Sequence, residues 1–129
     1  MPRDHEDLIC WQLADRLRQL VIAQTGDATP AARDRRFSSN IRDAVASACR
    51  NQSEGFYKFR HTEMRPYYSI AQGSLGEVKD CIEDGRERGY FSTEDARSMS
   101  QLCRRAMNAN LKFLHSLRRK DPAEPAKRP

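Results

Sequence analysis

Cysteines and histidines are the side chains of this 129-residue chain best suited to nucleophilic catalysis or metal binding, but neither type is clustered. The cysteines are separated by 39, 32 and 22 residues, with no Cys-x-x-Cys pair and no histidine at ligand spacing. They are Cys10, Cys49, Cys81 and Cys103. This pattern predicts small, buried, reduced thiols, and we expect neither a metal site nor a cofactor.

The remaining candidates for catalysis are equally isolated. His5, His61 and His115 lie far apart, and His115 is expected on an outer helix face, where it suits a surface or phosphate-contacting role. Glu54 has no evident carboxylate or base as a partner, and it suits a structural or interfacial role with nearby Asn51. No nucleophile elbow or glycine-rich phosphate loop is present, so we do not expect an enzyme.

A short aromatic and basic segment, residues 56–60, offers a different chemistry. It reads Phe-Tyr-Lys-Phe-Arg, which places Lys58 and Arg60 among three aromatic rings. Aromatic rings interleaved with basic side chains are typical of protein surfaces that stack on single-stranded nucleic acid. The same rings would equally well plug the end of a helical bundle, and the sequence leaves both interpretations open.

The spacing of the apolar residues, together with capping residues, glycines and prolines at the ends of each stretch, predicts four helices that position these residues. The expected spans are 4–25, the stretch that follows Thr29-Pro30 and runs to Gly55, about 62–89, and the stretch capped by Ser92 and running to about 118. Short connections between long helices force antiparallel neighbours. We therefore predict an all-α, up-down-up-down four-helix bundle over residues 1–120, followed by a disordered Pro-rich and charged tail at 121–129.

Two glycines inside the third predicted helix point to an assembly surface. Gly73 and Gly76 fall on the face turned away from the apolar stripe, beside Glu77 and Asp80. Each glycine costs a helix interior about 1 kcal/mol relative to alanine, so we expect a neighbouring molecule to pack against the bare backbone there. On the first helix, Trp11 and Ile22 lie off the main stripe and would either extend the core or form a second apolar seam against a neighbour.

Composition and charge narrow the class of protein. Hydrophobic residues make up 38% and charged residues 32%, the net charge is +5 and the pI is near 9.3. The start is acidic where a secretory signal would be basic, and no apolar run approaches about 18 residues. We expect a cytoplasmic protein that has no contact with a membrane, and the positive charge permits an RNA or DNA partner.

Several short motifs, taken together and in order, resemble one family. They are Asp7-Leu8-x-Cys10-Trp11-Gln12-x-Ala14-x-x-Leu17-x-x-x-Val21, Ile41-Arg42-x-Ala44, Asn51-x-x-Glu54-Gly55, Ile70-Ala71-x-Gly73-Ser74-Leu75-x-Glu77 and Gly89-Tyr90. In order and spacing they resemble the bacterial four-helix-bundle proteins encoded in intervening sequences of 23S ribosomal RNA genes. The resemblance covers residues 7 to about 118. The chain departs from that pattern at Cys49, where proline is usual, and at Ser53, where alanine is usual.

The resemblance implies a ring-forming, non-catalytic helical protein. Relatives form homopentameric rings, so a homo-oligomer, and specifically a pentamer, is the implied assembly. A distant branch, the accessory variability proteins of diversity-generating retroelements, binds a reverse transcriptase and nucleic acid. A partner protein, such as a reverse transcriptase recruited by the ring, is therefore a second implied role.

The distribution of charge favours a ring independently of the resemblance. Net charge is −2 over residues 1–29, +4 over 30–60, −2 over 61–89 and +5 over 90–129. An acidic, backbone-exposing face would meet a basic one, and contact between unlike patches closes into a ring or continues as a filament. The alternative is that these charges are solvated or pair within one bundle.

The sequence thus favours a helical-bundle scaffold that binds nucleic acid, RNA foremost, over an adaptor that recruits a partner enzyme. The nucleic-acid contacts we expect are Arg97, Arg104, Lys112, Arg119, Lys58 and Arg60. The oligomer contacts we expect are Gly73, Gly76, Glu77, Asp80, Trp11 and Ile22.

Overall fold

The computed structural model describes residues 2–119 as four α-helices, with no strand in that range. The helices are α1 (Ile9–Gln24), α2 (Arg35–Phe56), α3 (His61–Glu87) and α4 (Thr93–Arg119), and two 3-10 turns, η1 (His5–Asp7) and η2 (Pro30–Arg33), precede α1 and α2. The all-α prediction is confirmed. The expected tail at 121–129 lies outside the described residues.

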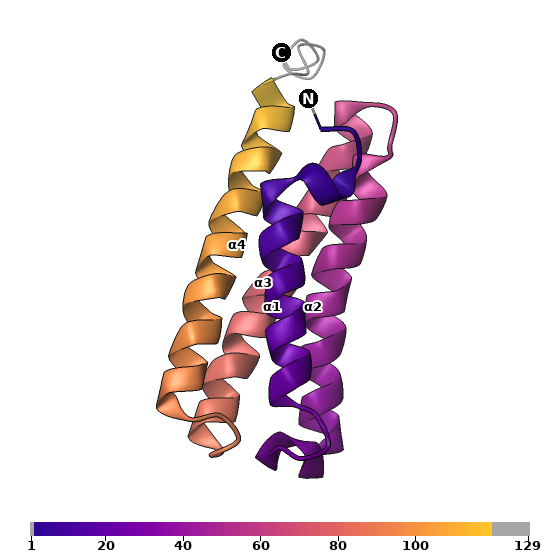
Figure 1. Ribbon diagram of the computed structural model, residues 1–129. Helices are drawn as coiled ribbons and strands as arrows, with labels where there is room; N and C mark the ends of the chain where they lie inside the picture. Colours follow the sequence, from indigo (N-terminus) through magenta and orange to yellow (C-terminus); the bar gives the residue numbers. More distant parts are fainter. Residues whose placement is uncertain (1, 120–129) are drawn as a thin grey trace.

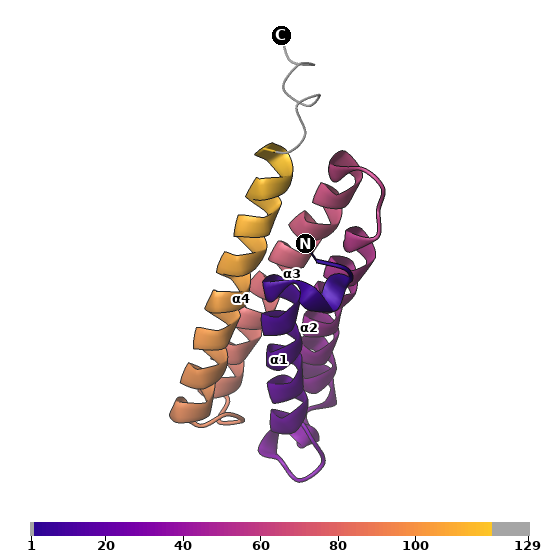
Figure 2. The same cartoon turned by 45° about the horizontal axis from the view of Figure 1, so that its top comes forward.

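The four helices lie side by side, and the chain reverses direction at each connection (Figures 1 and 2). Helix α1 packs against α2 and α4, and α3 packs against α2 and α4, so the helices form a closed square in section. The chain therefore brings the start of α1, the α2–α3 connection and the carboxyl end of α4 to the same end of the bundle (Figure 1).

Two predicted helix starts are wrong, and capping explains both. The carboxylate of Asp4 accepts a hydrogen bond from the Glu6 amide at 2.9 Å, which begins only the short η1, and extended Leu8 separates that turn from α1. The Thr29-Pro30 pair begins η2, whereas Asp34 caps α2 by accepting from the Phe37 amide at 3.1 Å. A side-chain cap satisfies an otherwise orphaned amide, so each new cap starts a new element.

The predicted end of α2 at Gly55 and the placement of Pro66 also need correction. Helix α2 runs one residue further, to Phe56, and Pro66 lies in the second turn of α3 instead of in or beside its first turn. Pro66 is exposed, and the missing amide affects one bond near the helix start. The predicted cap of the fourth helix is confirmed, because Ser92 Oγ accepts from the Asp95 amide at 3.0 Å.

The core consists of two apolar clusters stacked along the bundle. The larger joins all four helices around Leu17, Ile41, Leu75 and Met99, all 0% exposed. The smaller lies near the end that carries the α2–α3 connection. Its buried members are Leu8, Cys10, Met64, Tyr68, Leu114 and Leu117. The apolar pattern of the third helix predicts Tyr67 as a core residue. The buried tyrosine of α3 is instead Tyr68, and Tyr67 is only half-buried.

A mostly buried polar network links three helices within this core. Gln52 Nε2 on α2 donates to Asn110 Oδ1 on α4 at 3.0 Å. Asn110 Nδ2 donates to the Tyr68 carbonyl on α3 at 2.9 Å and to Gln72 Oε1 at 2.8 Å, and the Tyr68 hydroxyl donates to the Gln52 carbonyl at 2.7 Å. Gln52 and Asn110 are both 0% exposed. Because buried amides need partners, this network fixes the register of α2, α3 and α4.

Two glycines allow close approach between elements. A Cβ atom on Gly55 would lie 2.6 Å from Tyr67 Cβ, and one on Gly85 would lie 2.5 Å from a ring carbon of Phe91 and 2.7 Å from one of Phe37. These ring and backbone-proximal atoms have little room to move in a packed core. Gly55 and Gly85 are therefore packing residues, unlike Gly73 on the surface of α3.

At the other end of the bundle, hydrogen bonds and ion pairs join the α3–α4 connection to the start of α2. The Tyr90 hydroxyl donates to Asp34 Oδ2 at 2.7 Å, and Arg88 Nη1 lies 3.6 Å from the same oxygen. Arg88 Nε also donates to Asp84 Oδ1 at 3.0 Å. The hydrogen bond from Tyr90, followed by the Phe37 amide, lowers the pKa of Asp34 below its ordinary value.

The buried amides provide a test of the core. We expect Asn110→Leu to lower the free energy of unfolding by about 1–3 kcal/mol or more, because it leaves the buried Gln52 amide without a partner. Adding Gln52→Met should recover part of that loss, since both polar partners are then replaced by apolar groups of similar size. Equilibrium urea unfolding measures both. A double variant that loses the full sum of the two single effects would contradict the coupling.

The Asp34–Tyr90 hydrogen bond provides a test in pH. A carboxyl group with a lowered folded pKa stabilises the fold above its unfolded pKa, and this stabilisation is lost as pH falls through the folded value. We therefore expect wild type to exceed Tyr90→Phe in stability at pH 5–7, with the difference shrinking below about pH 4. Carboxyl NMR titration should show the pKa of Asp34 rising in Tyr90→Phe. An unchanged pKa of Asp34 in Tyr90→Phe would show that the Tyr90 hydrogen bond is not what lowers it.

Candidate nucleic-acid interface

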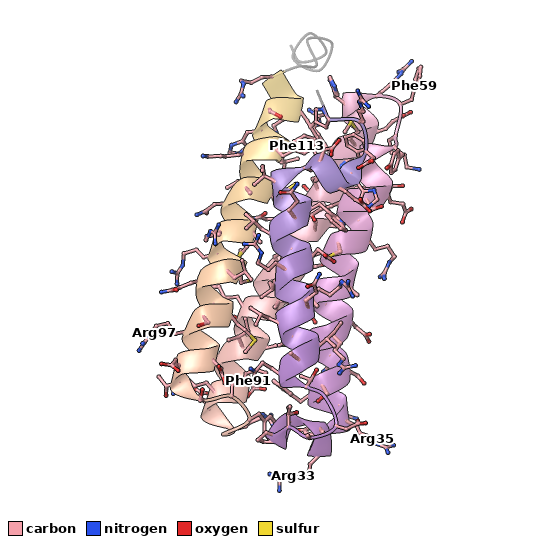
Figure 3. The ribbon with its side chains drawn as sticks, in the orientation of Figure 1. Arg33, Arg35, Phe59, Phe91, Arg97 and Phe113 are labelled. Carbon is pink, nitrogen blue, oxygen red and sulfur yellow. The ribbon has the colours of Figure 1, made fainter. Side chains whose placement is uncertain are left out.

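A row of cations runs along the outer side of α4. We call the predicted residues Arg97, Arg104, Lys112 and Arg119 the α4 ridge; each is exposed. They are seven or eight residues apart, close to two helical turns, so they remain on the side opposite the buried Met99 and Cys103. Figure 3 shows Arg97 projecting outward from the first half of the helix.

The charge of α4 is one-sided beyond its first turn. Its two acids, Glu94 and Asp95, lie in that turn, where they favour the positive helix end, and no acid follows along α4. Six cations do follow, because Arg105 and Arg118, which are also exposed, accompany the four residues of the ridge on α4. Within residues 2–119, none of these six forms an ion pair. No acid of that range therefore offsets their charge.

Arg105 and Arg118 are missing from the set predicted by sequence. The signal that would have identified them is the absence of any acid between Asp95 and Arg119, which makes every cation of that stretch a candidate. Arg105 has a further distinction. It lies with Lys112 beside a groove of about 660 Å³ between α1 and α4. The groove has a mainly apolar floor, formed by Leu8, Ile9, Cys10, Leu13, Ala109 and Phe113.

The α2–α3 connection brings a second group of cations and rings to the end of the bundle. Lys58 and Arg60, which the sequence predicts as nucleic-acid contacts, are exposed. Of the three aromatic residues in this segment, Phe56 is half-buried and packs on the smaller core cluster, which supports the bundle-plug interpretation for that ring alone. Phe59 is 97% exposed and extends from the end of the bundle (Figure 3).

The amino-terminal segment holds Tyr57 in place. The Tyr57 hydroxyl accepts a hydrogen bond from the His5 amide at 3.2 Å and lies 3.0 Å from His5 Nδ1. The His5 ring also meets Trp11 edge-on, with 4.9 Å between ring centroids. Trp11 is half-buried and packs against both core clusters, whereas Ile22 is 40% exposed near the other end of α1. Trp11 thus extends the core.

The outer face of α3 is acidic and partly bare. Gly73 is exposed, and no atom lies within 4 Å of a Cβ atom built on it. Gly76 is half-buried, with Met107 Cε of α4 at 4.0 Å from such an atom. Glu77 and Asp80 are exposed. The bare backbone predicted for this face is thus found at Gly73, whereas Gly76 turns partly toward α4.

Polar side chains of α2 form hydrogen bonds within that helix and with the helices beside it. Asn51 Nδ2 donates to the Ser47 carbonyl at 2.8 Å, one turn back along α2, and Ser47 Oγ lies 3.0 Å from Ser74 Oγ on α3. Arg42 Nε donates to Thr25 Oγ1 at 2.7 Å at the carboxyl end of α1. Arg42 is therefore used within the bundle and adds little to an outer basic face.

The thiols and imidazoles do not assemble into a reactive centre. Burial raises the pKa of Cys10 and Cys49 to about 12 and that of Cys103 to about 11, so these thiols are protonated at neutral pH and are weak nucleophiles. Within residues 2–119, no group of three or more His, Cys, Asp or Glu side chains could hold a metal ion. None of the described helices combines the length and the apolar character that crossing a membrane requires.

Comparison with known proteins assigns the chain to a family. The model of the family described as 23S rRNA-intervening sequence protein matches residues 6–110, which include α1, α2, α3 and most of α4. Of the α4 ridge, Lys112 and Arg119 lie beyond the matched stretch. None of the curated proteins matches this chain. On the strength of that match, which spans most of its length and agrees with its four-helix fold, the chain belongs to the 23S rRNA-intervening sequence protein family.

Proposed function

We propose that this protein is a non-catalytic, ring-forming helical bundle that associates with nucleic acid, RNA foremost, through the α4 ridge. The observation that carries the proposal is the set of six exposed cations that follow Asp95 on α4 and form no ion pair within residues 2–119. Cations without an acidic partner retain their attraction for phosphates, and repetition around a ring sums their fields.

The α2–α3 connection supports the same function from the end of the bundle. Lys58 and Arg60 are exposed there, and Arg119 lies at the carboxyl end of α4 on the same end of the molecule (Figure 1). A nucleic-acid strand that follows the α4 ridge would therefore meet further cations at this end of the bundle. Membership of the 23S rRNA-intervening sequence protein family is compatible with an RNA-associated role.

The outer face of α3 supports assembly into a ring. Its acids, Glu77 and Asp80, lie beside the bare backbone of Gly73, and it cannot pair well with a second copy of itself, because like charges would meet. A basic surface on a neighbouring copy complements it. Such a contact joins two different patches, and repeated from copy to copy it generates a ring where the rotation closes and a filament where it does not. Gly76 remains a candidate for the margin of that face and Ile22, on α1, for the complementary surface of the neighbouring copy, whereas Trp11 extends the core.

The α4 ridge has one competing use in this proposal, which is to meet the acidic face of α3 on the neighbouring copy. An adaptor that recruits a partner enzyme would use the same ridge against an acidic protein surface. Retention of RNA that weakens as salt rises separates nucleic-acid binding from the adaptor role, since an adaptor need not retain RNA at all.

The double variant Arg104→Glu/Arg119→Glu tests the ridge. We expect it to weaken RNA and DNA binding alike, because phosphate contacts position a ligand without reading its sequence. On a single strand, the slope of log affinity against log salt should become shallower by about 0.7 for each phosphate that the variant no longer neutralises. Fluorescence anisotropy at several salt concentrations measures both quantities.

The matched control is Arg33→Glu/Arg35→Glu, which makes the same charge change at the opposite end of the bundle (Figure 3). Both residues are exposed, and this control should bind more tightly than the ridge variant. Native mass spectrometry on the ridge variant separates the two uses of the ridge: dissociation of the ring would assign it to the neighbouring copy. An intact ring with unchanged RNA affinity would reduce the ridge to solvated surface.

Gly73→Leu tests assembly. A Cβ atom added at this position meets no other part of the described chain within 4 Å beyond its own helix backbone, so helicity should persist, while a bulky side chain should block a neighbour that packs on the bare backbone. Native mass spectrometry should show a shift from ring to monomer. Ser39→Leu, at an exposed position of α2, controls for added surface hydrophobicity and should keep the ring. A monomeric wild type, or an unchanged mass for Gly73→Leu, would refute the interface.

A further inference from the structure

Phe59 differs from every other aromatic side chain of the described chain in its exposure. It is 97% exposed, whereas the next most exposed ring, Tyr57, is 59% exposed and has its hydroxyl bonded to His5. No ring contact within residues 2–119 involves Phe59. Both faces of this ring are therefore open, and the fold itself makes no use of them.

The loop that presents Phe59 is anchored on both sides. The Tyr57 amide donates to the Glu54 carbonyl at 3.3 Å and the Lys58 amide to the Gly55 carbonyl at 3.1 Å, which continues the end of α2. The Arg60 amide donates to Glu63 Oε1 at 3.2 Å, which caps α3. With the backbone of its neighbours fixed in this way, the ring is held out on a short connection, so little backbone freedom of the loop remains to be lost on binding.

Cations flank Phe59 directly in the sequence. Lys58 precedes it with its ammonium 5.1 Å from the centre of the Tyr67 ring, and exposed Arg60 follows it. A nucleotide whose base lies on the Phe59 ring would have its phosphates beside these two charges. Aromatic rings joined to cationic side chains in this way bind successive bases and phosphates of a single strand.

This arrangement suits single strands and excludes paired ones. In a duplex the faces of the bases are covered by neighbouring bases, and freeing one requires unstacking. Cations alone, as on the α4 ridge, attract both forms. The open ring therefore adds a contact that only unpaired bases can make.

We propose that Phe59 is a stacking platform that makes the nucleic-acid interface selective for single-stranded RNA over duplex. This inference rests on the proposed nucleic-acid binding and adds the form of nucleic acid that is preferred. Lys58 and Arg60 hold the flanking phosphates, and the α4 ridge supplies the sequence-independent attraction.

The test uses the full chain with a 12-nucleotide uridine-rich RNA and a 12-base-pair RNA duplex. Wild type should bind the single strand more tightly. Phe59→Ala should lower single-strand affinity roughly fivefold or more, in line with the loss of one base–aromatic stack, and leave duplex affinity unchanged. Since the side chain is 97% exposed, the thermal melting of the variant should match wild type.

Two further variants separate stacking from apolar contact. Phe59→Leu keeps an apolar side chain but removes the ring, so it should behave as Phe59→Ala does. Phe59→Trp should retain affinity, and its exposed indole should be quenched by the single strand, in a chain whose other tryptophan, Trp11, is half-buried.

The outcomes separate this inference from the function on which it rests. Unchanged single-strand affinity in Phe59→Ala, equal loss for both RNA forms, or wild-type affinity in Phe59→Leu would overturn the stacking platform and leave the α4 ridge in place. A wild-type protein that binds neither RNA at low salt would overturn both. Loss of binding to both forms only in Arg104→Glu/Arg119→Glu would support the ridge independently.

Discussion

The buried amide network between α2, α3 and α4 is the constraint on which the rest of the structure depends. Apolar packing alone tolerates small shifts of one helix along another, but the paired amides of Gln52 and Asn110 leave each other unsatisfied if either helix moves. Asn110 also contacts the Tyr68 carbonyl, so a single side chain of α4 sets the height of adjacent α3 and of α2, which lies diagonally across the bundle. The positions of the surface groups follow from that register.

One consequence is that the core contacts and the charged outer faces of the bundle lie on different sides of each helix. Helix α4 turns Asn110 and its apolar stripe inward and leaves its cations wholly outward, while α3 presents acids and bare backbone at Gly73. The bonds that tie connections together, such as Tyr90 to Asp34 and His5 to Tyr57, lie at the ends of the bundle and do not involve the α4 ridge. The core and the charged faces are thus built from separate side chains.

The helices could be predicted from sequence because amphipathic periodicity and caps such as Ser92 are local signals. The errors arose where a second local signal competed, as when Asp4 capped the short η1 instead of α1, and when Asp34 instead of Thr29 capped α2. The Gln52–Asn110 pair could not be predicted, because its two amides are 58 residues apart and polar residues usually suggest the surface. The cations of α4 were found in part, since exposure follows from periodicity, whereas the isolation of Phe59 depends on the path of one loop.

The separation of the α4 ridge from the core has a consequence for how such a protein can diverge. A ridge cation shares no ion pair within the described chain, so replacing it should alter stability by about 0.5 kcal/mol or less. A lineage can therefore retune its affinity for a polyanion through single substitutions, each viable by itself. Gln52 and Asn110 face the opposite situation, because a change in either is costly until the other follows. Descendants of this fold should accordingly keep or lose their amide pair as a unit while their surface charge drifts freely.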